Sequence, residues 1–124
     1  MSDGYQLADL ATLREADEVE IESAATEAGP WHRAIIWVVV DGRDRVLIRS
    51  FRGPTARWYR EVMAWPDCRL VVGDRAIEVR AVPAADEDSI AACSQGLRQK
   101  YAGQPSMPAM VRAYLETTLE LVAR

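Results

Sequence analysis

The sequence contains few of the residues that build catalytic triads, metal centres and disulfide frameworks. Its 124 residues include one histidine, His32, and two cysteines, Cys68 and Cys93. No Gly-x-Ser-x-Gly motif accompanies the histidine, so we interpret His32 as a loop residue or a stacking partner rather than part of a serine triad. The two cysteines are too few and too far apart for a metal motif or a redox pair, and we expect two buried free thiols. One histidine among scattered carboxylates also predicts no metal site.

Phosphate-binding loop motifs, membrane spans and an excess of basic residues are also missing. Neither Gly-x-Gly-x-x-Gly nor the Walker sequence occurs, so the chain has no Rossmann turn and no P-loop. No apolar run approaches the roughly 20 residues that cross a membrane, and the N-terminus has no secretory pattern, which predicts a cytoplasmic protein with no membrane partner. A net charge of −4 opposes general binding to nucleic acid, which requires a basic face.

The composition predicts a single domain with its own hydrophobic core. The chain is 49% hydrophobic and 27% charged, as in an average soluble globular protein. A chain of 124 residues buries roughly two-thirds of its unfolded surface without metals or cross-links. No repeat, low-complexity tract or linker divides it, so we expect one domain over residues 1–124.

Hydrophobic periodicity predicts six strands and two to four helices. Strands are expected at residues 17–25, 34–40, 45–51, 68–72, 76–82 and 117–123. Helices are expected at residues 6–15, 56–65, 86–101 and 109–115. For residues 109–124, the sequence leaves a continuous helix to the C-terminus open as the alternative.

Two of these segments lead to sharper expectations. The run at 34–40 is rich in β-branched residues and uncharged, which is typical of a central strand covered on both faces, and the turn at 41–44 predicts that the next strand returns antiparallel to it. In the following helix, Thr55 is the expected N-cap. The 3.6-residue spacing predicts that this helix buries Trp58, Val62, Met63 and Trp65.

The segment at 45–65 is locally basic although the chain as a whole is acidic. The first turn of a helix leaves N–H groups unpaired, and guanidinium groups bind phosphate through two parallel hydrogen bonds. Ser50 offers a hydroxyl donor, Gly53 lets a ligand approach the backbone, and Arg33 is a further candidate. The segment therefore predicts a site for an anionic ligand, unless its arginines are solvated or pair with acids such as Glu61. These arginines are Arg49, Arg52, Arg57 and Arg60.

Aromatic residues near this segment allow two interpretations. Trp58 and Tyr59 open the helix and either belong to the core or stack on a planar ring, and the sequence leaves both open. For Trp37 and Trp65 we predict core positions, because aromatic side chains at strand or helix spacing usually pack inside.

The motifs at 49–54 and 57–60, followed by the helix exit at 64–67 and the hairpin turn at 73–75, resemble the FMN-binding split-barrel superfamily. They are most similar to its deazaflavin-dependent nitroreductase branch and to a small uncharacterised bacterial family within it. The resemblance implies a mainly β fold, a six-stranded antiparallel split barrel with two to four peripheral helices. It also implies a homodimer with ligand sites at the subunit interface.

The same resemblance implies a small-molecule ligand, FMN or a deazaflavin coenzyme, and an oxidoreductase of nitroreductase type in which the cofactor carries the hydride chemistry. The phosphate side of the cofactor would meet Arg33, Ser50, Arg52 and Gly53. Nearby residues would be Arg57, Trp58 and Tyr59. The alternative is a non-catalytic dimeric binding module that has lost the cofactor, because residues 27–33 hold a single arginine where the nitroreductases carry a basic Gly-rich loop.

Overall fold

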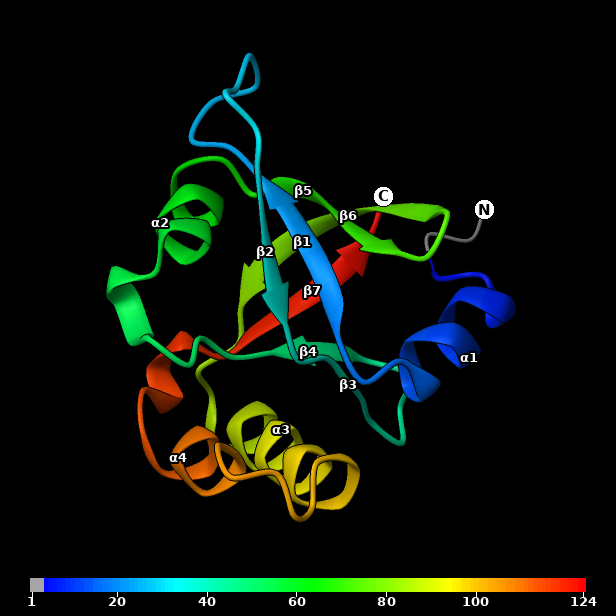
Figure 1. Ribbon diagram of the computed structural model, residues 1–124, viewed down its shortest axis with the longest axis vertical. Coiled ribbons are helices and arrows are strands. Elements are labelled where there is room, and N and C mark those ends of the chain that lie inside the picture. Colours follow the sequence, from blue (N-terminus) through cyan, green and yellow to red (C-terminus); the bar gives the residue numbers. More distant parts are fainter. Residues whose placement is uncertain (1–3) are drawn as a thin grey trace.

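The computed structural model describes residues 4–124 as a curled antiparallel sheet with helices around it (Figure 1). The strands are β1 (Val19–Ser23), β2 (His32–Ile36), β3 (Val39–Val40), β4 (Val46–Ile48), β5 (Asp67–Val72), β6 (Arg75–Pro83) and β7 (Leu119–Ala123). The helices are α1 (Leu7–Glu15), α2 (Arg57–Ala64), α3 (Glu87–Lys100) and α4 (Met107–Arg112), with 3-10 turns at Gly53–Thr55 and Leu115–Thr117. The seven strands follow the order β2-β1-β5-β6-β7-β4-β3 and form a half-barrel.

The strand count is seven rather than six because the predicted strand at 34–40 is divided. Its first part extends β2, which pairs with β1, and its last part is β3, which pairs with β4. The two parts therefore lie at opposite ends of the sheet order, and β2 is an edge strand rather than a central one. The predicted antiparallel return after the 41–44 turn is confirmed by the β3–β4 pair.

The residues of the uncharged run at 34–40 lie in different surroundings, although all of them are apolar. Val38 belongs to the main core, which lies between the sheet, α1 and α2, whereas Val39 belongs to a second core under α3 and α4. Ile35, on the edge strand, is 64% exposed. The residues of this apolar run therefore occupy three environments. The sequence pattern alone did not distinguish this arrangement from a single central strand.

The strand covered on both faces is β4. Val46 and Ile48 pack into the main core, and Leu47, which points to the opposite face, packs into the second core. In Figure 1, α3 and α4 lie below β4, which separates them from the rest of the sheet. By the same alternation, the side chain of the next residue, Arg49, points toward the second core.

The C-terminal strand predicted at 117–123 is confirmed as β7, which excludes the continuous helix. It pairs with both β6 and β4 and is central in the sheet. The helix predicted at 109–115 begins earlier, as α4, and ends at Arg112. Tyr114 then takes a left-handed backbone conformation, with φ of 56°, before the turn into β7.

Two expectations for α2 are wrong. The helix begins at Arg57 after Ala56, and the Thr55 hydroxyl donates to the carbonyl of Arg52, so Thr55 is not the N-cap. Met63 is 48% exposed, and Trp65 is only half-buried. The helix has two turns, and its buried stripe consists of Trp58, Glu61 and Val62, spaced three and four residues apart.

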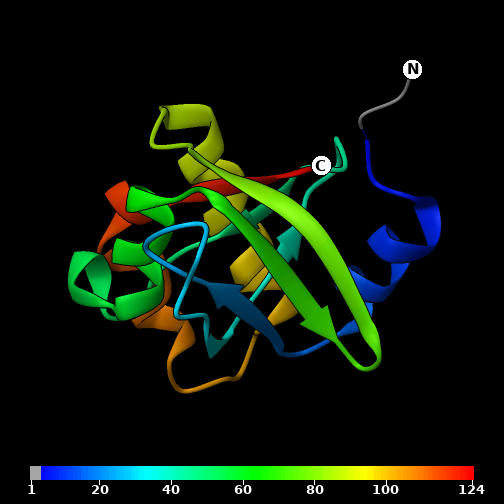
Figure 2. The same ribbon diagram turned by 90° about the horizontal axis from the view of Figure 1, so that it is seen from above.

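The predicted N-terminal helix and the predicted free thiols are confirmed. The helix predicted at 6–15 is α1, which lies beside the β5–β6 hairpin in Figure 2, where Asp9 accepts two hydrogen bonds from Arg75. Cys68 and Cys93 are buried free thiols, and burial raises the pKa of Cys68 to about 12 and that of Cys93 to about 11. No helix within residues 4–124 is long and apolar enough to cross a membrane.

Lys100, at the end of α3, is partly buried. Its ammonium donates to the carbonyl oxygens of Leu13 and Val38, both at 2.8 Å, and burial lowers its pKa from the usual 10.5 to about 8. The lysine therefore connects α3 to α1 and to the bend between β2 and β3, at the cost of holding a charge away from water.

The lowered pKa of Lys100 predicts a pH-dependent difference in stability between the wild type and Lys100→Met. Between pH 8 and pH 10.5 the unfolded chain binds more protons at this lysine than the folded protein does. The free energy of unfolding of the wild type, relative to that of Lys100→Met, is therefore expected to increase as the pH rises from about 8 to about 10. Urea denaturation of both proteins at several pH values measures this; a constant difference between them would contradict it.

Candidate functional site

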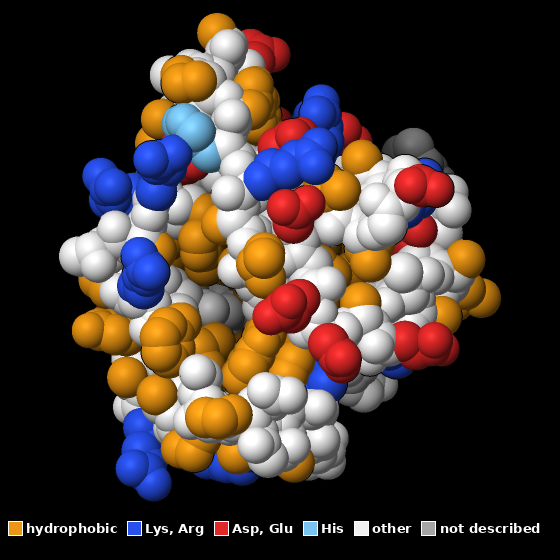
Figure 3. Space-filling model, viewed as in Figure 1, with side chains coloured by type: hydrophobic (Ala, Val, Ile, Leu, Met, Phe, Trp, Pro, Cys, Tyr) orange, Lys and Arg blue, Asp and Glu red, His pale blue; other side chains and the backbone are white. Residues whose placement is uncertain are grey.

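A groove of about 1040 Å³ opens beside the β2 edge of the half-barrel. Its walls come from β2, the segment between β4 and α2, α2 itself, and the chain on either side of the turn between α3 and α4. Figure 3 shows this hollow with hydrophobic side chains inside it. Basic side chains gather over the α2 side, and acidic ones lie over the strands on the other side.

The structure places four of the seven predicted cofactor-binding residues on the groove. Arg33, Arg52, Arg57 and Trp58 line it, whereas Ser50, Gly53 and Tyr59 are not among its lining residues. Arg33 pairs with Glu22 at 3.1 Å and with Glu20 at 3.5 Å, so its charge is already compensated. Within residues 4–124, Arg52 and Arg57 form no ion pair.

Ser50 and Gly53 shape the turn between β4 and α2. The Ser50 hydroxyl donates to the Gly53 carbonyl at 2.7 Å, and the Ser50 N–H donates to the Thr117 hydroxyl at 3.1 Å. Gly53 has φ of +72°, and a Cβ atom there would lie 2.5 Å from the Tyr114 ring. Both residues are buried, and their contacts indicate a structural role. They hold the turn that positions Arg49 and Arg52.

Arg49 is the largest fully buried side chain of the described protein, and it also lines the groove. It is 2% exposed. Its guanidinium donates to four neutral oxygens: the Thr118 hydroxyl at 2.9 Å, the Ser94 hydroxyl at 3.0 Å, the Met110 carbonyl at 2.8 Å and the Ile90 carbonyl at 3.1 Å.

No carboxylate of residues 4–124 compensates the charge of Arg49. Burial lowers the pKa of the guanidinium, and Arg98 on α3 adds to the effect through its like charge. A guanidinium carries five N–H donors, of which the four bonds to neutral oxygens use all but one, on Nη2. A buried cation without a counter-ion is costly, so an anion bound in the groove beside Arg49 would offset part of that cost.

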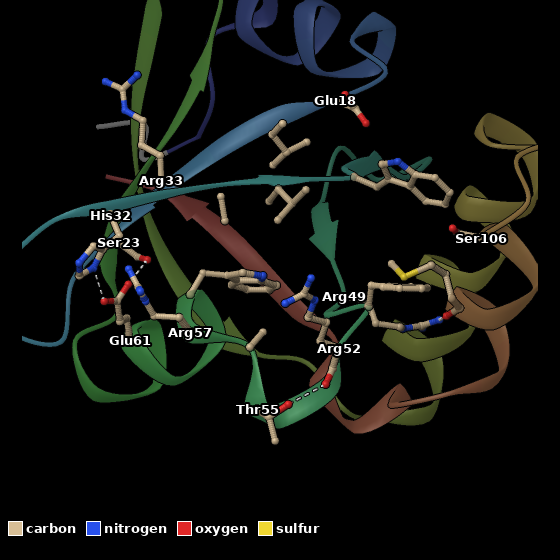
Figure 4. A pocket seen from close by; sticks show the side chains of 18 of the residues that line it. Glu18, Ser23, His32, Arg33, Arg49, Arg52, Thr55, Arg57, Glu61 and Ser106 are labelled. Carbon is tan, nitrogen blue, oxygen red and sulfur yellow. Dashed lines mark hydrogen bonds and ion pairs between the residues drawn. The ribbon is translucent and has the colours of Figure 1, made fainter.

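A second buried ionisable group, Glu61, lies at one end of the groove in Figure 4 and is 7% exposed. Its Oε2 lies 2.7 Å from Nδ1 of His32, and its Oε1 accepts a hydrogen bond from the Ser23 hydroxyl at 2.8 Å. All three side chains line the groove, and Figure 4 shows them together with Arg57. His32 is the first residue of β2 rather than a loop residue.

Aromatic side chains form part of the groove walls. Trp58 is 8% exposed and belongs both to the main core and to the groove lining, so the two interpretations of this residue are compatible. Trp37 stacks on Tyr101 with ring centroids 4.1 Å apart and planes 3° from parallel, and both rings line the groove. Tyr59 instead meets Trp58 edge-on, 5.9 Å away, and packs against the core.

Sequence reasoning missed Arg49 as the buried member of the arginine cluster, and it missed Ser23 and Glu61 as site residues. For Arg49 a signal was present, because it is two residues from Leu47 and therefore shares the strand face that packs under α3. For Glu61 the signal was weaker: it is the polar member of the buried stripe of α2.

The sequence profile of a bacterial family described as "Uncharacterized protein conserved in bacteria (DUF2255)" matches residues 9–121. No curated protein matches the sequence.

Solved structures share the fold at low sequence identity. The conserved hypothetical protein Rv2991 from Mycobacterium tuberculosis is 12% identical, with a TM-score of 0.71 over 100% of this chain and 84% of its own. HutZ, the haem storage protein from Vibrio cholerae, is 11% identical, with a TM-score of 0.66 over 98% of this chain and 91% of its own. An F420-H2 dependent reductase is 14% identical, with a TM-score of 0.59 over 86% of this chain and 93% of its own. These similarities support a split-barrel-like fold.

Proposed function

The chain belongs to the bacterial DUF2255 family, and for this member we propose a flavin- or deazaflavin-dependent oxidoreductase function. In this proposal the groove holds FMN or a deazaflavin coenzyme. The cofactor supplies the hydride chemistry when bound, and the protein binds and orients it.

The uncompensated charge of Arg49 is the observation that carries the proposal. FMN and deazaflavin coenzymes join a planar ring system to a phosphate, and a phosphate would supply the anion that Arg49 lacks. Arg52 and Arg57, which line the same groove without ion pairs among residues 4–124, would add to the attraction. Trp58 and Trp37 offer aromatic surface for a ring.

The size of the groove fits a ligand of this class. Its volume of about 1040 Å³ is slightly above the range of roughly 300–1,000 Å³ typical of small-molecule sites. The relatives that share the fold include reductases named for F420, which is a deazaflavin. Their sequence identity to this chain is low, so the similarity supports the fold alone. The support for cofactor binding comes from the residues of the groove.

We also propose that the protein is a homodimer whose second copy closes the groove. Ile35 on the edge strand β2 is 64% exposed, and Phe51 is 56% exposed, and both line the groove. Large apolar side chains in such positions are often covered by a partner, and an edge strand offers unpaired backbone groups beside them. Sedimentation equilibrium is expected to show a dimer, and a monomer at high concentration would contradict it.

Ligand titration tests the proposed function. Purified protein is expected to bind FMN or a deazaflavin coenzyme at micromolar concentration, seen as quenching of ligand fluorescence and a rise in the melting temperature. Riboflavin, which has the ring but no phosphate, is expected to bind at least tenfold more weakly. The double variant Arg52→Ala/Arg57→Ala should lose most of the binding. Arg112→Ala, which removes an exposed arginine outside the groove lining, is the matched control.

The outcomes separate the proposal from its alternative. Absence of binding by both cofactors overturns the oxidoreductase function. A dimer that binds neither cofactor and shows no turnover with reduced nicotinamide or reduced deazaflavin would instead favour a non-catalytic binding module on the same half-barrel.

A further inference from the structure

We propose that His32 is the proton donor of this groove and that Glu61 positions it. The inference rests on the proposed oxidoreductase function, because it concerns the proton that a substrate takes up when it receives a hydride. It assigns a chemical role to His32 and Glu61, which the proposed phosphate contacts do not use.

The geometry is that of a carboxylate–imidazole pair whose members are held by separate elements. Glu61 projects from α2, His32 begins β2 and Ser23 ends β1. The Glu61 carboxylate uses one oxygen for the Ser23 hydroxyl at 2.8 Å and the other for His32 Nδ1 at 2.7 Å. Ser23 is fully buried, and its hydroxyl contacts the carboxylate oxygen that the imidazole does not contact.

This contact determines which nitrogen of His32 is left without a protein partner. A carboxylate only accepts hydrogen bonds, so Nδ1 carries the hydrogen in the contact with Glu61. Nε2 has no hydrogen-bond partner among residues 4–124, and 35% of the His32 side chain is exposed. The second nitrogen is therefore free to exchange a proton with a molecule in the groove or with water.

A purely structural connection between β2 and α2 explains the contact less well. A glutamine at position 61 would accept the same hydrogen bond from Nδ1 without the cost of burying a charge. Within residues 4–124, no lysine or arginine forms an ion pair with Glu61, although Arg57 points into the same end of the groove (Figure 4). The contact through Nδ1 leaves Nε2 without a partner among residues 4–124, and a protonated imidazole donates from Nε2.

The charges along the groove suit a substrate that is reduced beside the phosphate site. Arg49 and Arg52 lie between the His32 end and Ser106, so an anionic group and a proton acceptor can be bound at different places in one groove (Figure 4). If a reduced cofactor supplied a hydride to one atom of a substrate double bond, the electron pair of that bond would pass to the other atom. His32 in its protonated form would give this atom the proton on Nε2, and the neutral imidazole that results would then take up a proton from the solvent.

The first measurement needs no cofactor. His32 is the only histidine, so labelling histidine with nitrogen-15 gives one pair of ring resonances. At alkaline pH the wild-type protein is expected to show the form with hydrogen on Nδ1, and Glu61→Ala is expected to show a mixture of both forms. A predominant Nε2–H form in the wild type would overturn the proposed orientation.

The second measurement uses the protein loaded with reduced cofactor and 2-cyclohexen-1-one as the probe substrate. His32→Gln is expected to lower kcat by roughly 100-fold or more, with cofactor affinity unchanged. Glu61→Gln, which keeps the hydrogen bond but not the charge, should lower kcat with little change in KM. Added imidazole should restore part of the activity of His32→Ala, which a merely structural histidine would not show.

The failures are distinguishable. A wild-type protein that binds neither cofactor overturns the proposed function and the proton transfer with it. A wild-type protein that binds cofactor and reduces the probe, together with an unchanged kcat in His32→Gln, overturns only the inference about His32. A loss of cofactor affinity in His32→Gln equal to the loss in turnover would show a binding role and also overturn it.

Discussion

Arg49→Met is expected to weaken the binding of FMN or deazaflavin coenzyme by roughly 10- to 100-fold. Hydrogen bonds to charged groups contribute about 1.5–3 kcal/mol, and about 1.4 kcal/mol corresponds to a factor of ten in affinity. Arg49 is 2% exposed, so water screens its charge little, and its interaction with a phosphate should reach this range. Methionine keeps much of the apolar stem but removes the charge and all five donors.

The free protein responds to Arg49→Met through two opposing effects. Removing a buried cation without a counter-ion is favourable, whereas the carbonyl groups of Ile90 and Met110 lose a hydrogen-bond donor. The decisive quantity is therefore the rise in melting temperature that a fixed ligand concentration causes within each variant. This rise is expected to be large in the wild type, smaller in Arg49→Lys, which keeps the charge, and nearly absent in Arg49→Met.

Circular dichroism of the free variants is the control for folding, and riboflavin is the control for the phosphate. Arg49→Met should bind riboflavin about as well as the wild type does, because the ring does not need the buried charge. Equal FMN affinity in folded wild type and Arg49→Met would contradict the role assigned to Arg49.

Local patterns predicted most of the strands correctly because their burial alternates. β1 shows charged and apolar residues in strict alternation, and β5 and β6 flank a turn with Gly73 at its centre. β7 is predicted by the same alternation, despite the competing helical interpretation. In each case the information lies within a few consecutive residues, which is the range over which a periodicity is visible.

The candidate site depends on contacts that no local pattern contains. The four acceptors of Arg49 lie 41 to 69 residues away in the chain. Glu61 lies 29 residues from His32 and 38 residues from Ser23. The resemblance to split barrels pointed to the segment between β4 and α2, but it did not separate Ser50, whose hydroxyl closes a turn, from Arg49, which lines the groove.

Gly96→Ala is expected to destabilise the protein by about 2 kcal/mol. Gly96 lies in α3 where the helix crosses β3, and a Cβ atom at this position would overlap the Cγ1 methyl of Val39. Val39 is 2% exposed and packs in the second core, so it has little room to move. Overpacking of a core typically costs about 1–3 kcal/mol, and the close overlap here favours the upper end of that range. The better helix propensity of alanine offsets about 1 kcal/mol of this cost, which leaves about 2 kcal/mol.

The double variant Val39→Ala/Gly96→Ala tests whether this overlap is the cause. Val39→Ala alone leaves a cavity and destabilises the protein, but the new methyl group at position 96 fills part of that cavity. The double variant should therefore be more stable than the sum of the single effects by about 1 kcal/mol or more. Gly42→Ala, where a Cβ atom meets nothing within 4 Å, should change stability by less than about 0.5 kcal/mol. Additive single effects in urea denaturation would show that α3 and β3 do not meet as closely as the structure indicates. Because Tyr101, which stacks on Trp37, directly follows this helix, Gly96→Ala should also weaken ligand binding at that wall of the groove.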